Sequence, residues 1–252
     1  ETLIPAMRAE AELAHRHGAA CFGQVGQQGS YSTSPDWYPG LSPSGRPDEM
    51  LGEVPHRLSP REIARFVKLY GEAARRIEQA GMDGIEVHAC HGHLLNAFLS
   101  PRTNLREDRY GGSVEGRTRI LLEILEEVRA ATGDRLVVGV RLPGDDFLAG
   151  GAVGGSVAET ARLVAPLIDY VNVAGPSEGG RQDGVTVPAV PSADWPQAVY
   201  ADSSSRIRAL TGLPVLLTGR IADPEVAERV VVDGKADLVG MVRALIADPE
   251  WV

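Results

Sequence analysis

The chain has 252 residues, a formal net charge of −9 and 43% hydrophobic residues. This length suits one large α/β domain, and the hydrophobic content allows a sizeable core. The acidic balance, without any run rich in lysine and arginine, argues against nucleic acid or an anionic membrane as a partner, and no apolar stretch approaches membrane-spanning length.

The two cysteines, Cys21 and Cys90, are too few for a disulfide framework, so we expect a cytoplasmic protein. No signal-peptide pattern stands at the start of the chain. The first residue is Glu1 rather than methionine, which indicates a processed or cut chain.

The first third of the chain predicts a helix, a strand and a long connection. The helix is expected over residues 4–17 and the strand over residues 19–25. Residues 26–58 are rich in Gly, Pro and Ser, and a connection of this length in a compact domain is usually functional. Trp37 and Tyr38 in this connection, and Trp195 further on, are expected to be packing or lid residues.

The clearest helix signal begins at Ser59. Ser59 is expected to be the N-cap, Pro60 takes the first helical position, and Glu62 completes a capping box. Apolar residues then recur at helical spacing until Gly81 ends the pattern. A buried-type strand over residues 84–88 follows directly.

The rest of the chain repeats the alternation of helix and strand that is typical of a parallel sheet. Ser113 is expected to cap a helix, and Ser156 with Glu159 to form a second capping box. Asp223 and Asp248 are each expected to open a further helix. The remaining strands are expected at residues 136–142, 170–174, 215–218 and 238–241.

Six strands in this alternation predict an α/β fold of the (β/α)8 TIM-barrel class, with about six of the eight strands present in this chain. The predicted elements begin with a helix that no strand precedes and stop at the start of a helix. We therefore expect residues 1–252 to form a single barrel domain without its first two strands and its C-terminal tail. No repeat and no low-complexity tract interrupts this pattern.

Three histidines, His88, His91 and His93, follow the strand at residues 84–88. Barrel enzymes carry reactive side chains where a strand ends, and imidazoles there can donate hydrogen bonds, transfer protons or bind metal. Cys90 between them raises the alternative of a zinc site, and with it a zinc hydrolase. Zinc takes a defined set of four ligands, so we expect no metal here.

The segment HACHGHLLNAFLSPRTNLREDRYGGSVEGR, residues 88–117, resembles the signature of the Old Yellow Enzyme family of flavin oxidoreductases. GQVGQQG (23–29), VGVRLPGDD (138–146), LLTGRIADPE (216–225) and ADLVGMVRALIADPE (236–250) are similar to further motifs of that family, in the same order. The resemblance runs from about residue 5 to the end and includes the dienoyl-CoA reductase and trimethylamine dehydrogenase-like branch.

The resemblance implies FMN at the carboxyl ends of the strands and NAD(P)H as the reductant. Hydride then passes through the flavin to an electron-poor double bond of a small-molecule substrate. His88 and His91 match the pair that holds the acceptor oxygen of the substrate. His93 stands where the family usually has a tyrosine that donates a proton, and histidine is the stronger acid of the two.

The resemblance also implies which residues contact the cofactor. A glutamine faces the pyrimidine edge of the flavin, an arginine lies near its N1 and O2 atoms, and the loops after the last two strands hold the phosphate. In this chain these residues are Gln24, Arg141, Gly219, Arg220, Val242 and Arg243. Arg106, Asp108, Tyr110 and Arg117 are expected to brace the loop after the histidines.

Three alternatives stay open at this point. An amine dehydrogenase of the same family is the runner-up to an ene-reductase. An iron–sulfur cluster is possible only in a C-terminal region outside this chain. The chain is also compatible with an inactive barrel fragment. A homo-oligomer is also left open.

Overall fold

In the computed structural model, the described residues are 2–32, 39–47, 52–145, 154–176, 180–182, 185–187 and 190–251. Six parallel strands form one sheet in the order β1-β4-β5-β6-β9-β10, which confirms the predicted β/α barrel class and the six strands. These strands are β1 (Phe22–Val25), β4 (Gly84–His88), β5 (Val137–Pro143), β6 (Tyr170–Ala174), β9 (Val215–Thr218) and β10 (Leu238–Gly240).

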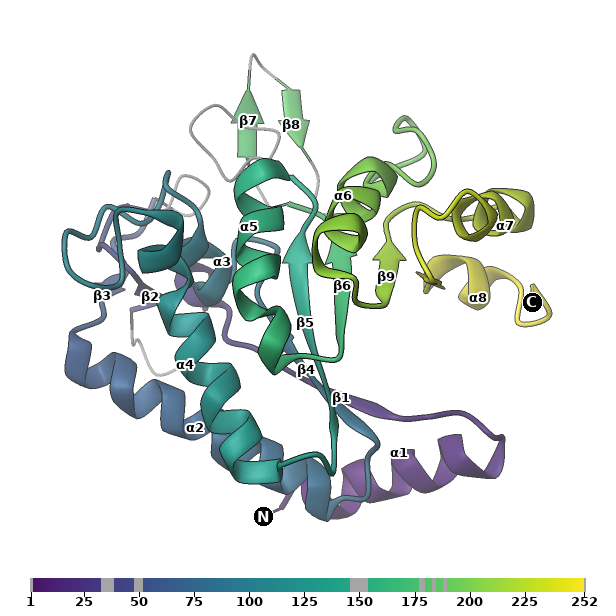
Figure 1. The fold of residues 1–252 in the computed structure, drawn as a ribbon, viewed down its shortest axis with the longest axis horizontal. Coiled ribbons are helices and arrows are strands. Elements are labelled where there is room, and N and C mark those ends of the chain that lie inside the picture. Colours follow the sequence, from purple (N-terminus) through teal and green to yellow (C-terminus); the bar gives the residue numbers. More distant parts are fainter. Residues whose placement is uncertain are drawn as a thin grey trace.

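Helices pack along one face of this sheet, and Figure 1 shows α4, α5 and α6 side by side in front of β5 and β6. α2 packs against α4 and continues this layer. The helices are α1 (Ile4–Arg16), α2 (Pro60–Gln79), α3 (Leu94–Leu99), α4 (Val114–Thr132), α5 (Gly154–Val164), α6 (Ala201–Thr211), α7 (Pro224–Val232) and α8 (Arg243–Ala247), with 3-10 turns η1 (Gly29–Tyr31) and η2 (Ala165–Leu167). No helix in the described part of the chain is long and apolar enough to cross a membrane.

Two small strand pairs lie outside the main sheet. β2 (Leu41–Ser42) and β3 (His56–Arg57) pair in parallel within the connection that precedes α2. β7 (Gly180–Gln182) and β8 (Val185–Val187) form an antiparallel pair that projects from the top of the view in Figure 1. Trp37 and Tyr38 lie outside the described residues, and Trp195 is half-buried.

The caps expected from the sequence are confirmed at three helices. The Ser59 hydroxyl accepts from the Glu62 amide at 3.3 Å, while the Glu62 carboxylate accepts from the Ser59 amide at 2.7 Å. Ser113 and Asp223 cap α4 and α7 through side-chain oxygens that accept from backbone amides. Such caps satisfy backbone donors that have no partner within the helix.

Two expectations about helix starts are wrong. α5 begins at Gly154, so Ser156 lies inside its first turn, and the Glu159 carboxylate pairs with Arg162 instead of closing a capping box. Asp248 follows the end of α8 and leads into a turn rather than opening a helix. The acidic and hydroxyl residues suited to a cap also suit turns and helix surfaces, which explains both errors.

The two faces of the sheet differ in chemistry because side chains alternate along each strand. One face meets the helices and is apolar and fully buried, through Ile85, Val87, Val138, Val140, Leu142, Val171, Val173, Val215 and Leu217. The other face carries polar side chains, among them Glu86, His88, Arg141, Asn172 and Thr218. The chemistry of the chain is therefore concentrated on the face turned away from the helices.

Candidate active site at the carboxyl ends of the strands

The three predicted histidines form one cluster at the end of β4. The ring centroids of His88 and His91 are 5.2 Å apart, those of His88 and His93 are 4.7 Å apart, and those of His91 and His93 are 6.2 Å apart. His88 is the last residue of the strand and is only 5% exposed, and His93 is the N-cap of α3. The spacing expected from the sequence thus brings all three imidazoles together.

A tight turn between the strand and α3 presents His91. His91 has a φ of 60°, a left-handed conformation that non-glycine residues adopt rarely, and Gly92 follows at 74°. The Gly92 amide donates to the Asn96 side chain at 2.7 Å, and the Leu94 amide donates to the Gln27 carbonyl at 3.0 Å. Backbone strain of this kind clusters at functional sites, where neighbouring contacts maintain it.

Burial keeps His88 and His91 uncharged. Desolvation is the main cause that lowers the pKa of His88 to about 3, with further contributions from His91, His93 and Arg141. Desolvation, followed by the Arg141 charge and His93, lowers the pKa of His91 to about 4. Both side chains are therefore neutral imidazoles at neutral pH, each with one N–H donor and one acceptor nitrogen.

Arg141 lies beside His88 on the neighbouring strand, because the register pairs the two residues across β4 and β5. Two buried nitrogen atoms at this place have no hydrogen-bond partner in the protein, Nδ1 of His88 and Nε of Arg141. An unsatisfied buried polar group costs about 1–3 kcal/mol. The site is therefore arranged to receive polar atoms from outside the chain.

A cavity of about 680 Å³ connects the histidine end with the loops after β9 and β10. The sequence-predicted residues on its wall are His91, Arg141, Gly219, Arg220, Val242 and Arg243. Six of the nine predicted site residues thus surround one space, although they come from four different strand ends. The remaining three, His88, His93 and Gln24, lie outside the cavity lining.

The structure gives the two loops additional roles. The Arg220 and Arg243 guanidinium groups donate to the carbonyls of Ala193 (2.7 Å) and Pro191 (3.0 Å), so both hold the segment that closes one side of the cavity. A Cβ atom on Gly219 would lie 2.5 Å from the Tyr200 ring. Packing against Tyr200, together with a φ of 140°, therefore already requires glycine at position 219.

Gln24 occupies β1, in register with Glu86 of β4. Its Nε2 atom donates to Oε1 of Glu86 at 2.6 Å. The sequence analysis missed Glu86, although the alternation of side chains along β4 places it on the same face as His88. An acidic residue within an otherwise apolar strand was the signal that could have identified it.

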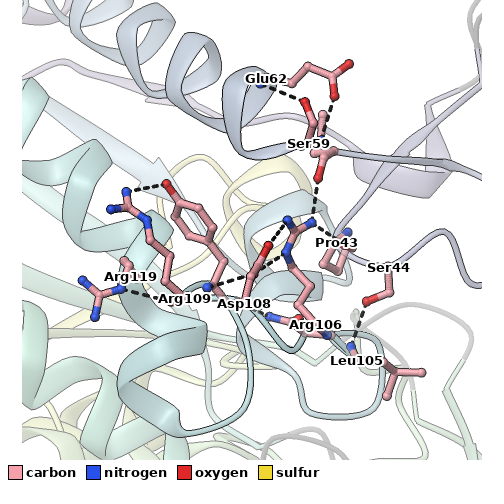
Figure 2. A network of polar contacts seen from close by, with 12 residues as sticks. Pro43, Ser44, Ser59, Glu62, Leu105, Arg106, Asp108, Arg109 and Arg119 are labelled. Carbon is pink, nitrogen blue, oxygen red and sulfur yellow. Dashed lines mark hydrogen bonds and ion pairs between the residues drawn. The ribbon is translucent and has the colours of Figure 1, made fainter.

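The predicted brace of the loop after α3 is confirmed, and Figure 2 shows its part around Arg106 and Asp108. The Arg106 guanidinium donates to the carbonyls of Pro43 (2.7 Å) and Leu58 (2.6 Å) and to both carboxylate oxygens of Asp108 (2.9 and 2.6 Å). The Arg106 side chain is only 1% exposed, so these contacts compensate a buried charge. The loop after α3 is thereby tied to the segment that enters α2.

Two further residues extend this brace. Tyr110 donates from its hydroxyl to Glu123 at 2.9 Å, and its carbonyl accepts from Asn104 at 2.7 Å. Arg117 donates to the carbonyls of Leu99 and Gly112. These contacts are structural, as expected, and they fix the loop that follows the histidine cluster.

The cluster also has the composition of a metal site. One ligand atom from each of His88, Cys90 and His91 lies within 4.8 Å of the others. The Cys90 sulfur is 3.7 Å from Nε2 of His88, and burial raises the pKa of the thiol, so Cys90 is protonated at neutral pH. The positive charge of the neighbouring Arg141 disfavours binding of a metal cation at this place. That the site holds no metal stays a prediction, which chelation can test.

Several known oxidoreductases are similar to this chain. A 34% identical relative, N,N-dimethylglycine/sarcosine dehydrogenase of Chromohalobacter salexigens, matches 100% of this chain and 37% of its own length. The multifunctional alkene reductase/demethylase OYE of Caballeronia cordobensis is also 34% identical, over 100% of this chain and 37% of its own length. A 2-naphthoyl-CoA reductase solved as a complex with 2-naphthoyl-CoA superposes with a TM-score of 0.90 at 26% identity, covering 99% of this chain and 39% of the reductase.

The chain therefore spans between a third and two fifths of the length of these relatives. The sequence profile that describes the NADH:flavin oxidoreductase / NADH oxidase family matches residues 4–252, almost the whole chain. With a six-stranded parallel β/α sheet and a polar site at its strand ends, the chain belongs to the NADH:flavin oxidoreductase / NADH oxidase family.

Proposed function

We propose that this protein is an FMN-dependent oxidoreductase of the ene-reductase type. It uses NAD(P)H to reduce the double bond of a small α,β-unsaturated carbonyl or enoyl compound. The observation that carries this proposal is the cavity that joins His91 and Arg141 to the loops at residues 219–220 and 242–243. Membership of the flavin oxidoreductase family supports the cofactor.

The residues present fit FMN. Arg141 has a buried Nε donor without a protein partner, and the flavin ring offers carbonyl oxygens and a ring nitrogen as acceptors. Gln24 and Arg141 would hold the ring, while the loops with Arg220 and Arg243 would hold the phosphate. The permanent guanidinium charge of Arg141 would favour a reduced ring that carries negative charge. When bound, FMN would supply the hydride-transfer chemistry, accepting hydride from NAD(P)H and passing it to the substrate.

His88 and His91 stabilise the substrate oxygen in this proposal. Hydride addition to the β-carbon moves negative charge onto the carbonyl oxygen, and fixed N–H donors aimed at that oxygen lower the barrier. Because burial keeps both imidazoles neutral, each offers one N–H donor to the carbonyl oxygen. In this proposal His93, whose ring centroid is 4.7 Å from that of His88, delivers a proton to the neighbouring carbon.

An amine dehydrogenase is the second candidate. The similarity to N,N-dimethylglycine/sarcosine dehydrogenase and to an alkene reductase/demethylase favours it. The Arg141 charge next to His88 favours the ene-reductase, because it opposes a protonated amine but not a carbonyl oxygen. Secondary amines with a dye as electron acceptor, and enones with NAD(P)H, separate the two activities in parallel assays.

Phenols test the role assigned to the histidines, because a phenolate oxygen resembles the charged oxygen of the intermediate enolate. We expect His88→Ala and His91→Ala each to weaken phenol binding by about 10- to 100-fold, the value of one hydrogen bond to a charged acceptor. FMN content should stay the same in both variants. His17→Ala, at an exposed position beyond α1, is the matched control. Unchanged phenol affinity in both site variants would refute the assignment.

A further inference from the structure

Glu86 is a buried carboxylate at the centre of the polar face. It is 6% exposed and lies two residues before His88 on β4, so the two side chains point to the same side of the sheet. A buried carboxylate is tolerated only when hydrogen-bond donors satisfy its oxygens. The role proposed above for the histidines, Gln24 and Arg141 does not use Glu86.

Donors from three residues on two other strands satisfy this carboxylate. Gln24 of β1 donates from Nε2 to Oε1 at 2.6 Å. Tyr170 and Asn172 of β6 donate to Oε2 at 2.9 and 3.0 Å. Thr218 of β9 donates to Oδ1 of Asn172 at 3.3 Å and so continues the network. Oε1 is thus the atom that faces Gln24, whereas Oε2 is occupied from the opposite side.

This network determines which way the Gln24 amide points. Both carboxylate oxygens of Glu86 accept hydrogen bonds in this network, whereas a primary amide has a donating NH2 end and an accepting carbonyl end. Gln24 must therefore turn its NH2 group toward Glu86, because the reverse orientation would set two acceptor oxygens against each other. The carbonyl oxygen of Gln24 is left to accept from another group, and the side chain is exposed enough to do so.

We propose that Glu86 is a positioning residue that fixes Gln24 as a hydrogen-bond acceptor toward the bound ring. This inference rests on the proposed binding of FMN. The pyrimidine edge of FMN carries one N–H group, at N3, between two carbonyl oxygens. A Gln24 carbonyl held by Glu86 would pair with that N–H, so the site would select a flavin with a free N3–H over one that carries a methyl group at N3.

The test compares binding of FMN and of N3-methyl-FMN to the flavin-free protein by fluorescence quenching. The wild type should bind FMN at least about 10-fold more tightly than the methylated flavin, which corresponds to one hydrogen bond. Glu86→Gln keeps the shape of the side chain but offers both a donor and an acceptor, so the Gln24 amide is free to turn. We expect this variant to lose affinity for FMN and to keep its affinity for N3-methyl-FMN.

Tyr170→Phe is the matched control, because it removes a donor to the same carboxylate without changing its charge or Oε1. The preference for FMN should stay at the wild-type value in this variant. A parallel loss of affinity for both flavins in Glu86→Gln, or an unchanged preference, would show that Glu86 only supports the fold. If Glu86→Gln does not fold, Gln24→Leu serves instead, and a wild-type preference in that variant overturns the inference.

The two proposals fail in different ways. A wild-type protein that binds neither flavin contradicts the proposed function. A wild-type protein that binds FMN, with a preference that is independent of Glu86, contradicts only the positioning role.

Discussion

Replacing His88 by asparagine removes a titratable group from the buried site and should make the protein less sensitive to acid. His88 is 5% exposed, and its pKa is lowered to about 3, mainly by desolvation. In the unfolded chain the same group titrates near 6.5. Asparagine keeps a polar side chain of similar reach but takes up no proton.

The sign follows from which state binds the proton first. Above pH 6.5 the imidazole is neutral in both states and contributes no pH dependence. Between 6.5 and about 3 the unfolded chain binds a proton that the folded protein excludes, so acid favours unfolding. A fall from pH 7 to pH 5 crosses about 1.5 pH units of this window, which removes about 2 kcal/mol of unfolding free energy at about 1.4 kcal/mol per unit.

Urea unfolding at pH 7 and at pH 5 measures this difference. The loss of unfolding free energy between the two pH values should be about 2 kcal/mol smaller in His88→Asn than in the wild type, a large part of the 5–15 kcal/mol that is usual for a domain. His17→Asn is the matched control for the loss of one exposed imidazole. Equal losses in the wild type and His88→Asn would refute the buried, neutral state of His88.

Three further outcomes follow from the site and its brace. Asp108→Asn should lower the unfolding free energy by about 3 kcal/mol in chemical denaturation, because Arg106 keeps a buried charge without its ion-pair partner. A loss below about 1 kcal/mol would mean that the backbone carbonyls alone stabilise the buried Arg106 charge. His93→Phe should slow stopped-flow re-oxidation by an enone more than reduction by NAD(P)H, and equal rates in the wild type and the variant would assign the proton to another donor. Prolonged chelation should leave reduction of the enone unchanged, whereas a loss that zinc restores would assign a metal to His88, Cys90 and His91.

The elements that the sequence predicts most closely are those with a strong local pattern. The strands at Gly84–His88, Tyr170–Ala174 and Val215–Thr218 have the expected bounds, because each is a short, mostly apolar run that turn residues limit. The capping box of Ser59 and Glu62 is a local contact and is therefore readable from four consecutive residues.

Two of the helices that the sequence did not predict have weak local patterns. α6 (Ala201–Thr211) contains three serines, and only Ser204 and Ile207 are buried, so its periodicity is faint. α8 (Arg243–Ala247) is a single short helix with no buried residue. Their formation depends on tertiary packing, which overrides a marginal propensity.

The site shows the same division. The histidines lie within six consecutive residues, so the sequence placed them together. The partners of Glu86 come from positions 62, 84 and 86 residues away, and only the assembly of β1, β4, β5 and β6 into one sheet brings them to one carboxylate. A short sequence motif carries no information about strand register over such distances.

The most direct test of the central claim is the spectrum of the purified chain after incubation with FMN and removal of unbound flavin. We expect a yellow protein with one FMN per chain that bleaches when NAD(P)H is added without oxygen and regains its colour with one equivalent of an enone. A protein that remains colourless after this treatment, or a bound flavin that NAD(P)H leaves oxidised, would contradict the account.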